Sequence, residues 1–334
     1  MKSKLLLLTL FAAFAGAATA QSNVTIYGVA DAGITVENNG GAVGSVTRLD
    51  SGILNGSRLG FKGVEDLGDG LSALFTLEMG INIDDGTAAQ GGLGFGRQSW
   101  VGLAGKFGAV KLGRQFSPVY ANVSTFDPFA NGLAGDSARL FNFSGSRINN
   151  AVTYGYETNG FRGQLIYGMG EVPGNTSASR TVGGFAGYKK GPIDAVLATT
   201  TIADRTGSVH AKTTLLGGNY DFGSATVYVA YAWNKDATAA GAPSAGANTR
   251  DALIGVAMPI GAGSIRTSYI RKSDRALGNA NAHQFAAGYV YNLSKRTALY
   301  TSYGRLANDG AATYKAGALG ATDKLFDVGM RHTF

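Results

Sequence analysis

The chain has 334 residues, a formal charge of +7 and a hydrophobic content of 45%, and it contains no cysteine. This length suits one large all-β domain or two ordinary domains. The lack of cysteine excludes a disulfide framework, a thiolate metal site and a thiol nucleophile.

The first twenty residues have the composition of a secretory signal peptide. Lys2 and Lys4 precede a short apolar stretch, and the small residues at 18–20 form a cleavage site. We predict that residues 1–20 are removed and that residues 21–334 form one domain. The apolar stretch is too short for a membrane-spanning helix, and no later run approaches the roughly 18 apolar residues that such a helix requires. An exported chain of this kind is either soluble or a membrane β-barrel, whose strands give only a weak signal.

The rest of the chain is a succession of strand-like segments. Each is close to the roughly 9–11 residues with which a tilted strand crosses a bilayer. Helical periodicity is not persuasive in any part of it. We count about sixteen such segments, near residues 23–36, 56–65, 71–81, 97–105, 108–116, 147–157, 160–170, 181–190, 192–202, 211–221, 224–234, 250–259, 262–272, 281–292, 296–306 and 322–334.

The connections between these segments alternate in length. The short ones are turns at 65–70, 105–108, 158–160, 190–192, 221–224, 259–262 and 293–296. The long polar ones are loops at 37–55, 82–96, 117–146, 170–180, 235–249 and 307–321, with shorter loops near 203–210 and 273–280. Such alternation places the short turns at one end of the sheet and the long loops at the other, which is typical of a membrane barrel.

The two faces of several strands differ in polarity. Alternation with a period of two places Arg58, Arg147 and Arg162 opposite the apolar residues of their own strands, and puts Glu78 on the polar face of 71–80. A soluble sandwich would bury the apolar face, whereas a membrane barrel would turn it to lipid and line a lumen with the other. Periodicity leaves both readings open.

The positions of the aromatic residues favour the membrane barrel. Many fall toward strand ends, as in the aromatic belts at membrane interfaces. They are Tyr27, Trp100, Tyr154, Tyr156, Tyr167, Tyr231, Trp233 and Tyr291. On the first strand, Gly28, Ala30 and Ala32 lie opposite Asp31, and small outward residues would allow close packing against a neighbouring subunit.

The longest interval without a strand pattern runs from Gln115 to Ser146. A connection of this length in a compact domain is usually functional or disordered. Disorder fits poorly, because six aromatic residues in it need a surface to pack against; they are Phe116, Tyr120, Phe126, Phe129, Phe141 and Phe143. If the strands close into a barrel, we expect this loop to fold inside and narrow the lumen.

Five segments resemble the general diffusion porins of Gram-negative outer membranes, in their β-proteobacterial, neisserial-type branch. They are NVTIYGVADAG (23–33), GSRLGFKGVEDLGDGLSALFTLE (56–78), GRQSWVGLAGKFGAVKLGRQ (96–115), NLSKRTALYTSYG (292–304) and DVGMRHTF (327–334). The resemblance implies an all-β fold, a sixteen-stranded antiparallel transmembrane barrel that assembles as a homotrimer. It also implies that the third external loop folds inward to form a constriction, where basic residues of the wall face acidic residues of the loop.

Carried over to this sequence, the resemblance assigns Arg58, Arg97 and Arg147 to the wall of the constriction. Alternation independently turns Arg58 and Arg147 inward and places Glu78 in the lumen. For Arg97 the alternation is ambiguous, because an inward Arg97 shares its side with Val101 and would leave Trp100 facing lipid. Asp127 corresponds to the acidic partner on the loop and Asp136 is a second candidate, and the acidic loop motif of the family is reduced here. Lys62, Lys111 and Arg162 are further lumen residues without an assigned position.

Other chemistries find little support in the sequence. The three histidines are scattered, with no nucleophile context that would suggest an enzyme. Isolated acidic residues in loops, such as Asp84, Asp85 and Asp309, are a weak basis for a metal site. The basic residues form no clustered stripe, so we expect no nucleic-acid partner.

We therefore predict an outer-membrane channel, surrounded by lipid, for passive diffusion of small hydrophilic solutes and inorganic ions. We expect a modest anion preference, no catalytic activity and no cofactor. Two alternatives remain. One is a substrate-specific channel, although the sequence shows no aromatic slide along the lumen. The other is a secreted or surface β-sandwich adhesin, which would be soluble and have irregular loop lengths.

Overall fold

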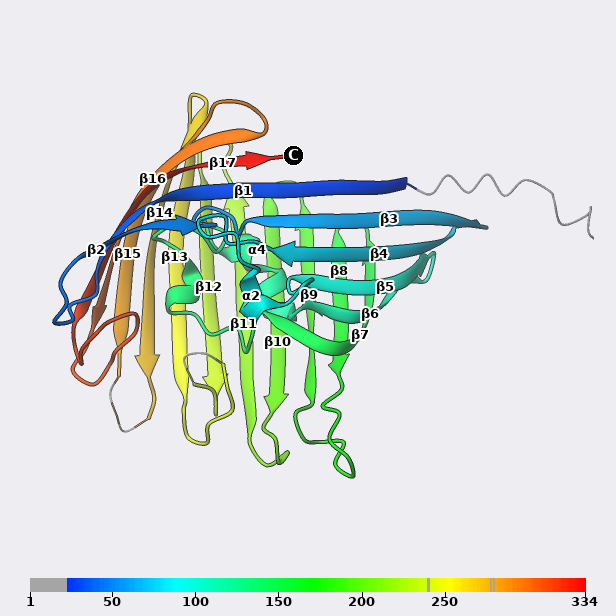
Figure 1. Cartoon of the computed structure of the whole chain (residues 1–334). Coiled ribbons are helices and arrows are strands. Elements are labelled where there is room, and N and C mark those ends of the chain that lie inside the picture. Colours follow the sequence, from blue (N-terminus) through cyan, green and yellow to red (C-terminus); the bar gives the residue numbers. More distant parts are fainter. Residues whose placement is uncertain (1–22, 239–240, 277, 279) are drawn as a thin grey trace, which may run out of the picture.

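The computed structural model describes residues 23–238, 241–276, 278 and 280–334, so the predicted signal peptide at 1–20 lies outside the described residues. A single antiparallel sheet surrounds the interior of the protein (Figure 1). Its strands are β1 (Asn23–Asn38), β2 (Val46–Ser51), β3 (Arg58–Gly68), β4 (Leu71–Gly80), β5 (Gln98–Gly105), β6 (Gly108–Phe116), β7 (Arg147–Thr158), β8 (Phe161–Gly168), β9 (Thr181–Lys190), β10 (Ile193–Ala203), β11 (His210–Asp221), β12 (Thr226–Lys235), β13 (Thr249–Ile260), β14 (Gly263–Asp274), β15 (Ala282–Asn292), β16 (Thr297–Asn308) and β17 (Thr322–Thr333).

From β3 onward each strand pairs with the next, and β17 pairs with β1, so the sheet closes on itself. Both β2 and β3 pair with β1 and follow one another along it, so they occupy one position in the barrel. The predicted sixteen-stranded antiparallel barrel is therefore confirmed. Closure also leaves no exposed sheet edge, which suits a protein surrounded by lipid.

The prediction of a continuous loop at 37–55 is wrong, because the short strand β2 lies within it. The chain breaks away from β1 between β2 and β3, at residues 52–57. There the backbone N–H groups of Leu54 and Asn55 donate to Asp31 Oδ2 at 3.0 and 2.7 Å. This inward step holds Leu54 among buried apolar side chains. The sequence gives no clear signal for β2, because most of its residues are polar.

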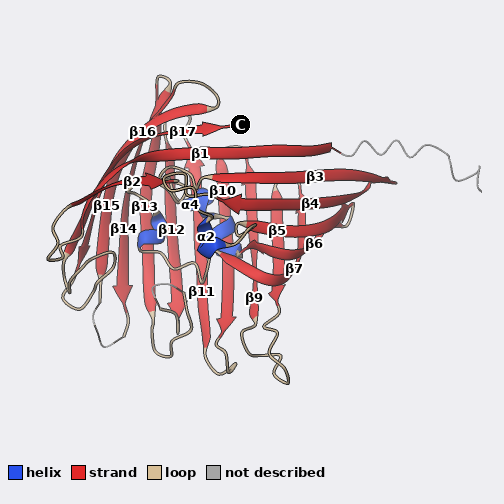
Figure 2. Cartoon of the chain, in the orientation of Figure 1, coloured by secondary structure: helices blue, strands red, loops and turns tan. Residues whose placement is uncertain are grey.

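The two ends of the barrel differ as predicted. At one end the strands are joined by turns of a few residues, and at the other by long loops. The described parts of the loops contain four short helical pieces (Figure 2): α2 (Ala89–Gly92), α3 (Pro118–Ala121), α4 (Val123–Phe126) and η1 (Ser137–Arg139). None of the helices in the described part of the chain is long and apolar enough to cross a membrane.

The outward face of the barrel is apolar and the inward face is largely polar. Leu165, Ile26 and Ile254 are 67%, 62% and 56% exposed on the outside. Thr153 and Glu78, which point inward, are 1% and 4% exposed. This distribution is inverted relative to a soluble protein and matches a barrel in lipid.

The predicted position at the membrane interface is wrong for two aromatic residues, Tyr27 and Trp100. The hydroxyl of Tyr27 donates to Glu78 Oε2 at 2.9 Å, so this ring faces the interior. Trp100 pairs with Thr76 across the β4–β5 ladder, and the Lys111 ammonium lies 4.3 Å from the centre of its ring. The outward residue of this part of β5 is Val101, which is 57% exposed.

The small residues of β1 are outward, as alternation predicts, but one of them has a partner within the chain. The ring of Phe334 covers Gly28, where an added Cβ would lie 2.3 Å from a ring carbon. The absence of a side chain at Gly28 therefore allows the ring of Phe334 to pack against the β1 backbone. Ala30 and Ala32 are the small residues that continue this outward row.

Candidate pore constriction

The connection between β6 and β7, residues 117–146, packs against the inner wall of the barrel. Phe126 and Phe129 are 0% exposed. Phe126 lies against Gly217 of β11 and Pro128 lies against Gly255 of β13, where an added Cβ would come within 2.7 and 2.6 Å of them. Glycines on the wall thus allow the segment to approach the backbone of the strands closely.

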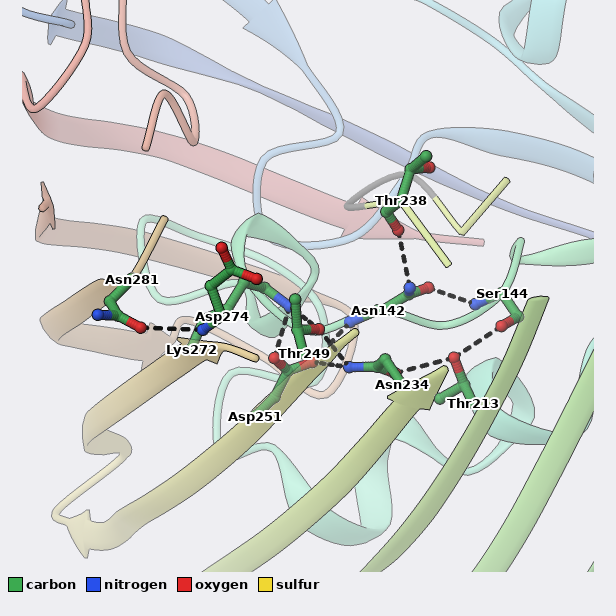
Figure 3. A network of polar contacts seen from close by, with 10 residues as sticks. All are labelled: Asn142, Ser144, Thr213, Asn234, Thr238, Thr249, Asp251, Lys272, Asp274 and Asn281. Atoms are coloured by element: carbon green, nitrogen blue, oxygen red, sulfur yellow. Dashed lines mark hydrogen bonds and ion pairs between the residues drawn. The ribbon is translucent and has the colours of Figure 1, made fainter. Parts of the chain in front are cut away.

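A buried polar network anchors the far end of this segment (Figure 3). The backbone N–H of Asn142 donates to Asp251 Oδ2 at 3.1 Å, and its side-chain amide donates to the Thr238 carbonyl at 2.8 Å. Asp251 in turn forms an ion pair with Lys272, and both side chains are 0% exposed. Ser144 contacts Thr213 through their hydroxyl groups, 2.6 Å apart.

The middle of the segment is held by strands β16 and β17 and by the step between β2 and β3. The Ala134 N–H donates to Ser302 Oγ at 2.9 Å, and Arg139 forms an ion pair with Asp323. The Leu133 N–H donates to the Ile53 carbonyl at 2.6 Å, which joins the segment to the inward step between β2 and β3. These bonds and the apolar contacts together fix the segment against strands β9–β17.

Arg97 and Glu78, two predicted constriction residues, form a buried ion pair. Arg97 Nε lies 2.8 Å from Glu78 Oε1, and their side chains are 9% and 5% exposed. The other carboxylate oxygen of Glu78 accepts from Tyr27. Arg97 precedes β5 and lies outside its alternation, which explains how both Arg97 and Trp100 can face inward.

Arg58 and Arg147 lie beside this pair. Arg147 Nε donates to the Arg97 carbonyl at 2.9 Å, and its guanidinium lies 5.6 Å from the centre of the Tyr120 ring. Arg58 is within electrostatic range of Arg97, Glu78 and Tyr120. The three predicted arginines therefore lie together on one wall, opposite α3 of the packed segment.

Asp127 lies away from the arginines, inside its own loop. Its Oδ1 accepts from the Phe129 N–H at 2.8 Å, and its Oδ2 accepts from the N–H groups of Asn131 and Ser137, both at 3.1 Å. The side chain is 1% exposed, and burial raises its pKa. These bonds organise the turn of the loop around a single carboxylate.

Asp136 begins the short helix η1, where its Oδ1 accepts from the Ala138 N–H at 2.7 Å. The surrounding protein, and then the negative charge of Asp127, raise the pKa of Asp136 to about 6. Arg139 and Lys315 act in the opposite direction. Asp136 is thus a loop carboxylate that changes charge near neutral pH.

The further lumen candidates Lys62, Lys111 and Arg162 all face inward. Lys62 lies 5.2 Å from the centre of the Tyr27 ring. Arg162 pairs with Asp194 at 2.6 Å and also donates to Thr125 of the packed segment at 3.0 Å. Lys111 and Arg162 line a pocket of about 570 Å³ between the wall and the segment.

Sequence reasoning missed several residues of this region. Tyr120, whose ring lies 5.6 Å from the Arg147 guanidinium, projects from a loop that has no period. Arg266 and Arg331 also face inward and lie within electrostatic range of each other. Alternation could have identified both of them, since the outward neighbours Tyr269 and Met330 are 43% and 52% exposed. Among the described residues, no group of three or more His, Cys, Asp or Glu could hold a metal ion.

Comparison with known proteins agrees with this architecture. Residues 7–311 match the family model described as Gram-negative porin. Outer membrane porin protein 32 of Delftia acidovorans is 34% identical over the full length of both chains, and the major outer membrane protein P.IB of Neisseria lactamica is 29% identical over the same extent. The solved structure of an anion-selective porin from Comamonas acidovorans covers 94% of this chain and 100% of its own, with a TM-score of 0.81 and 30% identity. The chain therefore belongs to the Gram-negative porin family, whose members form channels in the outer membrane.

Proposed function

We propose that this porin is a passive, water-filled channel for small hydrophilic solutes and inorganic ions, with a preference for anions. The observation that carries the preference is a set of inward basic side chains with no carboxylate within 4.0 Å in the described part of the chain. They are Arg58, Lys62, Lys111, Arg147, Arg266 and Arg331.

The inward carboxylates offset little of this charge. Those paired with a basic side chain are Glu37, Asp50, Glu78, Asp194, Asp251 and Asp323, and those buried under hydrogen bonds are Asp31 and Asp327. Glu157 and Asp221 are exposed but lie at the turn end of the barrel. A lumen with this balance attracts anions, since charged side chains lining a pore select ions by their sign. The relative from Comamonas acidovorans is described as anion-selective, which supports the same sign here.

We further propose that residues 117–146 narrow the lumen. The support is their packing against β9–β17, which leaves the arginine wall of β3–β7 facing the segment across the interior. The constriction would then be bordered by Tyr120 on the segment and by Arg58, Arg97 and Arg147 on the wall. Glu78 would moderate the charge of Arg97, while the buried Asp127 would shape the loop and contribute little field to the passage.

We also propose that the protein assembles as a homotrimer. Small outward residues on β1, Ala30 and Ala32, support this by allowing a neighbouring subunit to approach closely. The trimer would leave three separate pores, since each chain encloses its own lumen.

Single-channel recording in a planar bilayer tests the proposed function. Replacing chloride by a bulky organic anion should lower the conductance strongly, whereas replacing potassium by a bulky organic cation should lower it less. Equal losses for both replacements would contradict an anion preference. An absence of conductance steps from folded, inserted protein would contradict the channel itself.

A further inference from the structure

The outward face of β11–β17 carries a row of basic side chains at the loop end of the barrel. They follow the same alternation as the exposed apolar residues of these strands, such as Leu216, Ile254 and Tyr303. We call this row the basic rim: His210, Lys212, Lys235, Arg250, Arg271, His283, Arg305 and Lys324. All of its members except the half-buried His283 are exposed.

The basic rim has no counter-charge on its own surface. No lysine or arginine of the rim forms an ion pair or a side-chain hydrogen bond with another described residue. The outward positions of β11–β17 contain neither Asp nor Glu, because Asp251, Asp323 and Asp327 all point inward and are 0% exposed. The strand positions of the row therefore carry charge of one sign, and the loop residue Asp236 is a carboxylate at its edge.

The strand register brings several of these charges directly opposite one another. Lys212 faces Lys235 across β11–β12, and Arg305 faces Lys324 across β16–β17. Like charges in directly opposed positions destabilise a sheet. A repeated arrangement of this kind is best explained by an anionic partner outside the chain, which would turn the repulsion into shared binding.

The depth of the rim agrees with a position among lipid headgroups. Outward aromatic residues lie two positions farther from the loop end, so they are about 7 Å closer to the middle of the barrel. They are Trp233, Tyr269, Phe285, Tyr303 and Phe326. Aromatic belts mark the membrane interface, and the long loops of outer-membrane barrels face the exterior. The rim therefore lies at the headgroups of the outer leaflet.

One part of the rim is shaped as a shallow pocket. Lys212, Lys235, His210 and Ser208 line a depression of about 340 Å³. Asp236 also borders it, and one oxygen of its carboxylate accepts from the Gly246 N–H at 2.8 Å. Two ammonium groups and a hydroxyl around such a space suit the tetrahedral oxygens of a phosphate group.

We propose that the basic rim binds the phosphate-bearing headgroups of outer-leaflet lipids and so holds a shell of anionic lipid around β11–β17. A second copy of the chain is a poorer partner, because two apposed rims would bring like charges together. Lipid provides both components that the surface matches, apolar chains for the aromatic row and phosphate for the basic rim.

The fluorescence of Trp233 can report lipid bound at the basic rim, because Trp233 lies next to two rim residues. Its register partner on β13 is Arg250, and Lys235 lies two residues away. The chain contains two tryptophans, so a Trp100→Phe variant leaves Trp233 alone. This variant is reconstituted in phosphatidylcholine vesicles that contain a small fraction of brominated phosphatidic acid or, in parallel, of brominated phosphatidylcholine. We expect the brominated phosphatidic acid to quench Trp233 several-fold more efficiently. Because each basic residue at a membrane surface contributes about fivefold in affinity for anionic lipid, the combined changes Lys212→Gln, Lys235→Gln and Arg250→Gln should reduce this preference by about fivefold or more.

A matched control removes three charges from the turn end of the barrel, through Lys190→Gln, Lys295→Gln and Arg296→Gln. This variant should keep the preference of the parent protein. Equal quenching by the two lipids in the parent, or an unchanged preference after loss of the rim charges, would overturn the proposal. Loss of the preference on addition of inorganic phosphate at the concentration of the lipid would also overturn it, since the rim would then bind free phosphate.

Discussion

Arg58 and Arg147 differ from Arg97 in the charge that they offer to a passing ion. Glu78 neutralises Arg97, whereas no described carboxylate lies within 4.0 Å of Arg58 or Arg147. Two unit charges about 4 Å apart interact by roughly 1 kcal/mol in water and about 4 kcal/mol at an effective dielectric of 20. An ion that passes these two arginines experiences an energy between those limits, enough for several-fold discrimination.

Removing this pair should weaken the anion preference. Arg58→Ser combined with Arg147→Ser is expected to shift the reversal potential in a potassium chloride gradient toward that of a cation-selective pore. The shift should shrink at high salt, because the Debye length falls from about 10 Å at 0.1 M to about 3 Å at 1 M. Lys190→Ser with Arg296→Ser is the matched control, since it removes two exposed charges at the turn end. An equal shift in that control would mean that net charge, rather than position, sets the selectivity.

Asp136 should make the selectivity depend on pH. Its pKa is raised to about 6, so the carboxylate is charged at pH 7.5 and protonated at pH 5. Protonation removes a negative charge from the loop, and the anion preference should therefore increase as the pH falls through 6. The facing groups Asp127, Arg139 and Lys315 remain in place in an Asp136→Asn variant, whose reversal potential should change less with pH over this range. A variant with the same pH dependence as the parent protein would exclude Asp136 as the titrating group.

The residues that sequence reasoning placed well are those in regular strands. Alternation correctly turned Arg58 and Glu78 inward, because a strand shows its two faces with a strict period of two. Arg147 is also inward, but a register shift at the start of β7 breaks the alternation there and turns Ile148 inward as well. Alternation could not decide Arg97, which lies just before β5. It could not place Asp127 either, because a carboxylate in a loop can serve a neighbouring charge or its own backbone with the same local sequence.

At the scale of single elements, the packed segment explains why some strands show little alternation. Val196, Leu215, Leu253 and Ile270 point inward on β10, β11, β13 and β14, yet they are buried beneath Phe126 and its neighbours. Those strands are apolar on both faces because one face meets lipid and the other meets the segment. The aromatic content of residues 115–146 predicts that the loop is ordered, but only the structure identifies the wall that it covers.

The loop should depend on the carboxylate of Asp127 for its stability. An asparagine at this position would direct its amide N–H₂ at backbone N–H groups that now have an acceptor, so at least one buried donor would lose its partner. Such a loss costs about 1–3 kcal/mol. Asp127→Asn is therefore expected to lower the free energy of unfolding by about that amount, measured by urea denaturation of the refolded barrel. Asp309→Asn, in an exposed loop, should leave it nearly unchanged; equal effects of the two changes would contradict an organising role for Asp127.

On the scale of the whole molecule, the exterior of the barrel requires a membrane and the interior requires water. The sequence was sufficient for this conclusion, because closely spaced strands, alternating loop lengths and family motifs all agreed. The short strand β2 was not predicted, since six mostly polar residues beside a break in the chain carry little strand signal. The basic rim was not predicted for a different reason. Its members are distributed over seven strands, and only the closed barrel brings them into one row.

Assembly should be visible in detergent extracts. Unheated protein is expected to migrate as an oligomer and heated protein as a monomer, because heat separates subunits that pack through the small residues of β1. Replacing Ala30 with Phe should weaken the oligomer by preventing close approach, whereas Val229→Phe, a change at an outward position on the far side of the barrel, should not. A native mass equal to that of one chain for the unaltered protein would contradict the trimer.

The reversal potential of the unaltered protein in a planar bilayer, across a dilute potassium chloride gradient, reports whether the inward basic side chains control ion passage. We expect a potential whose sign shows that chloride is more permeant than potassium, and whose magnitude decreases as both salt concentrations rise. A potential of the opposite sign would show that the inward arginines and lysines do not control the passage.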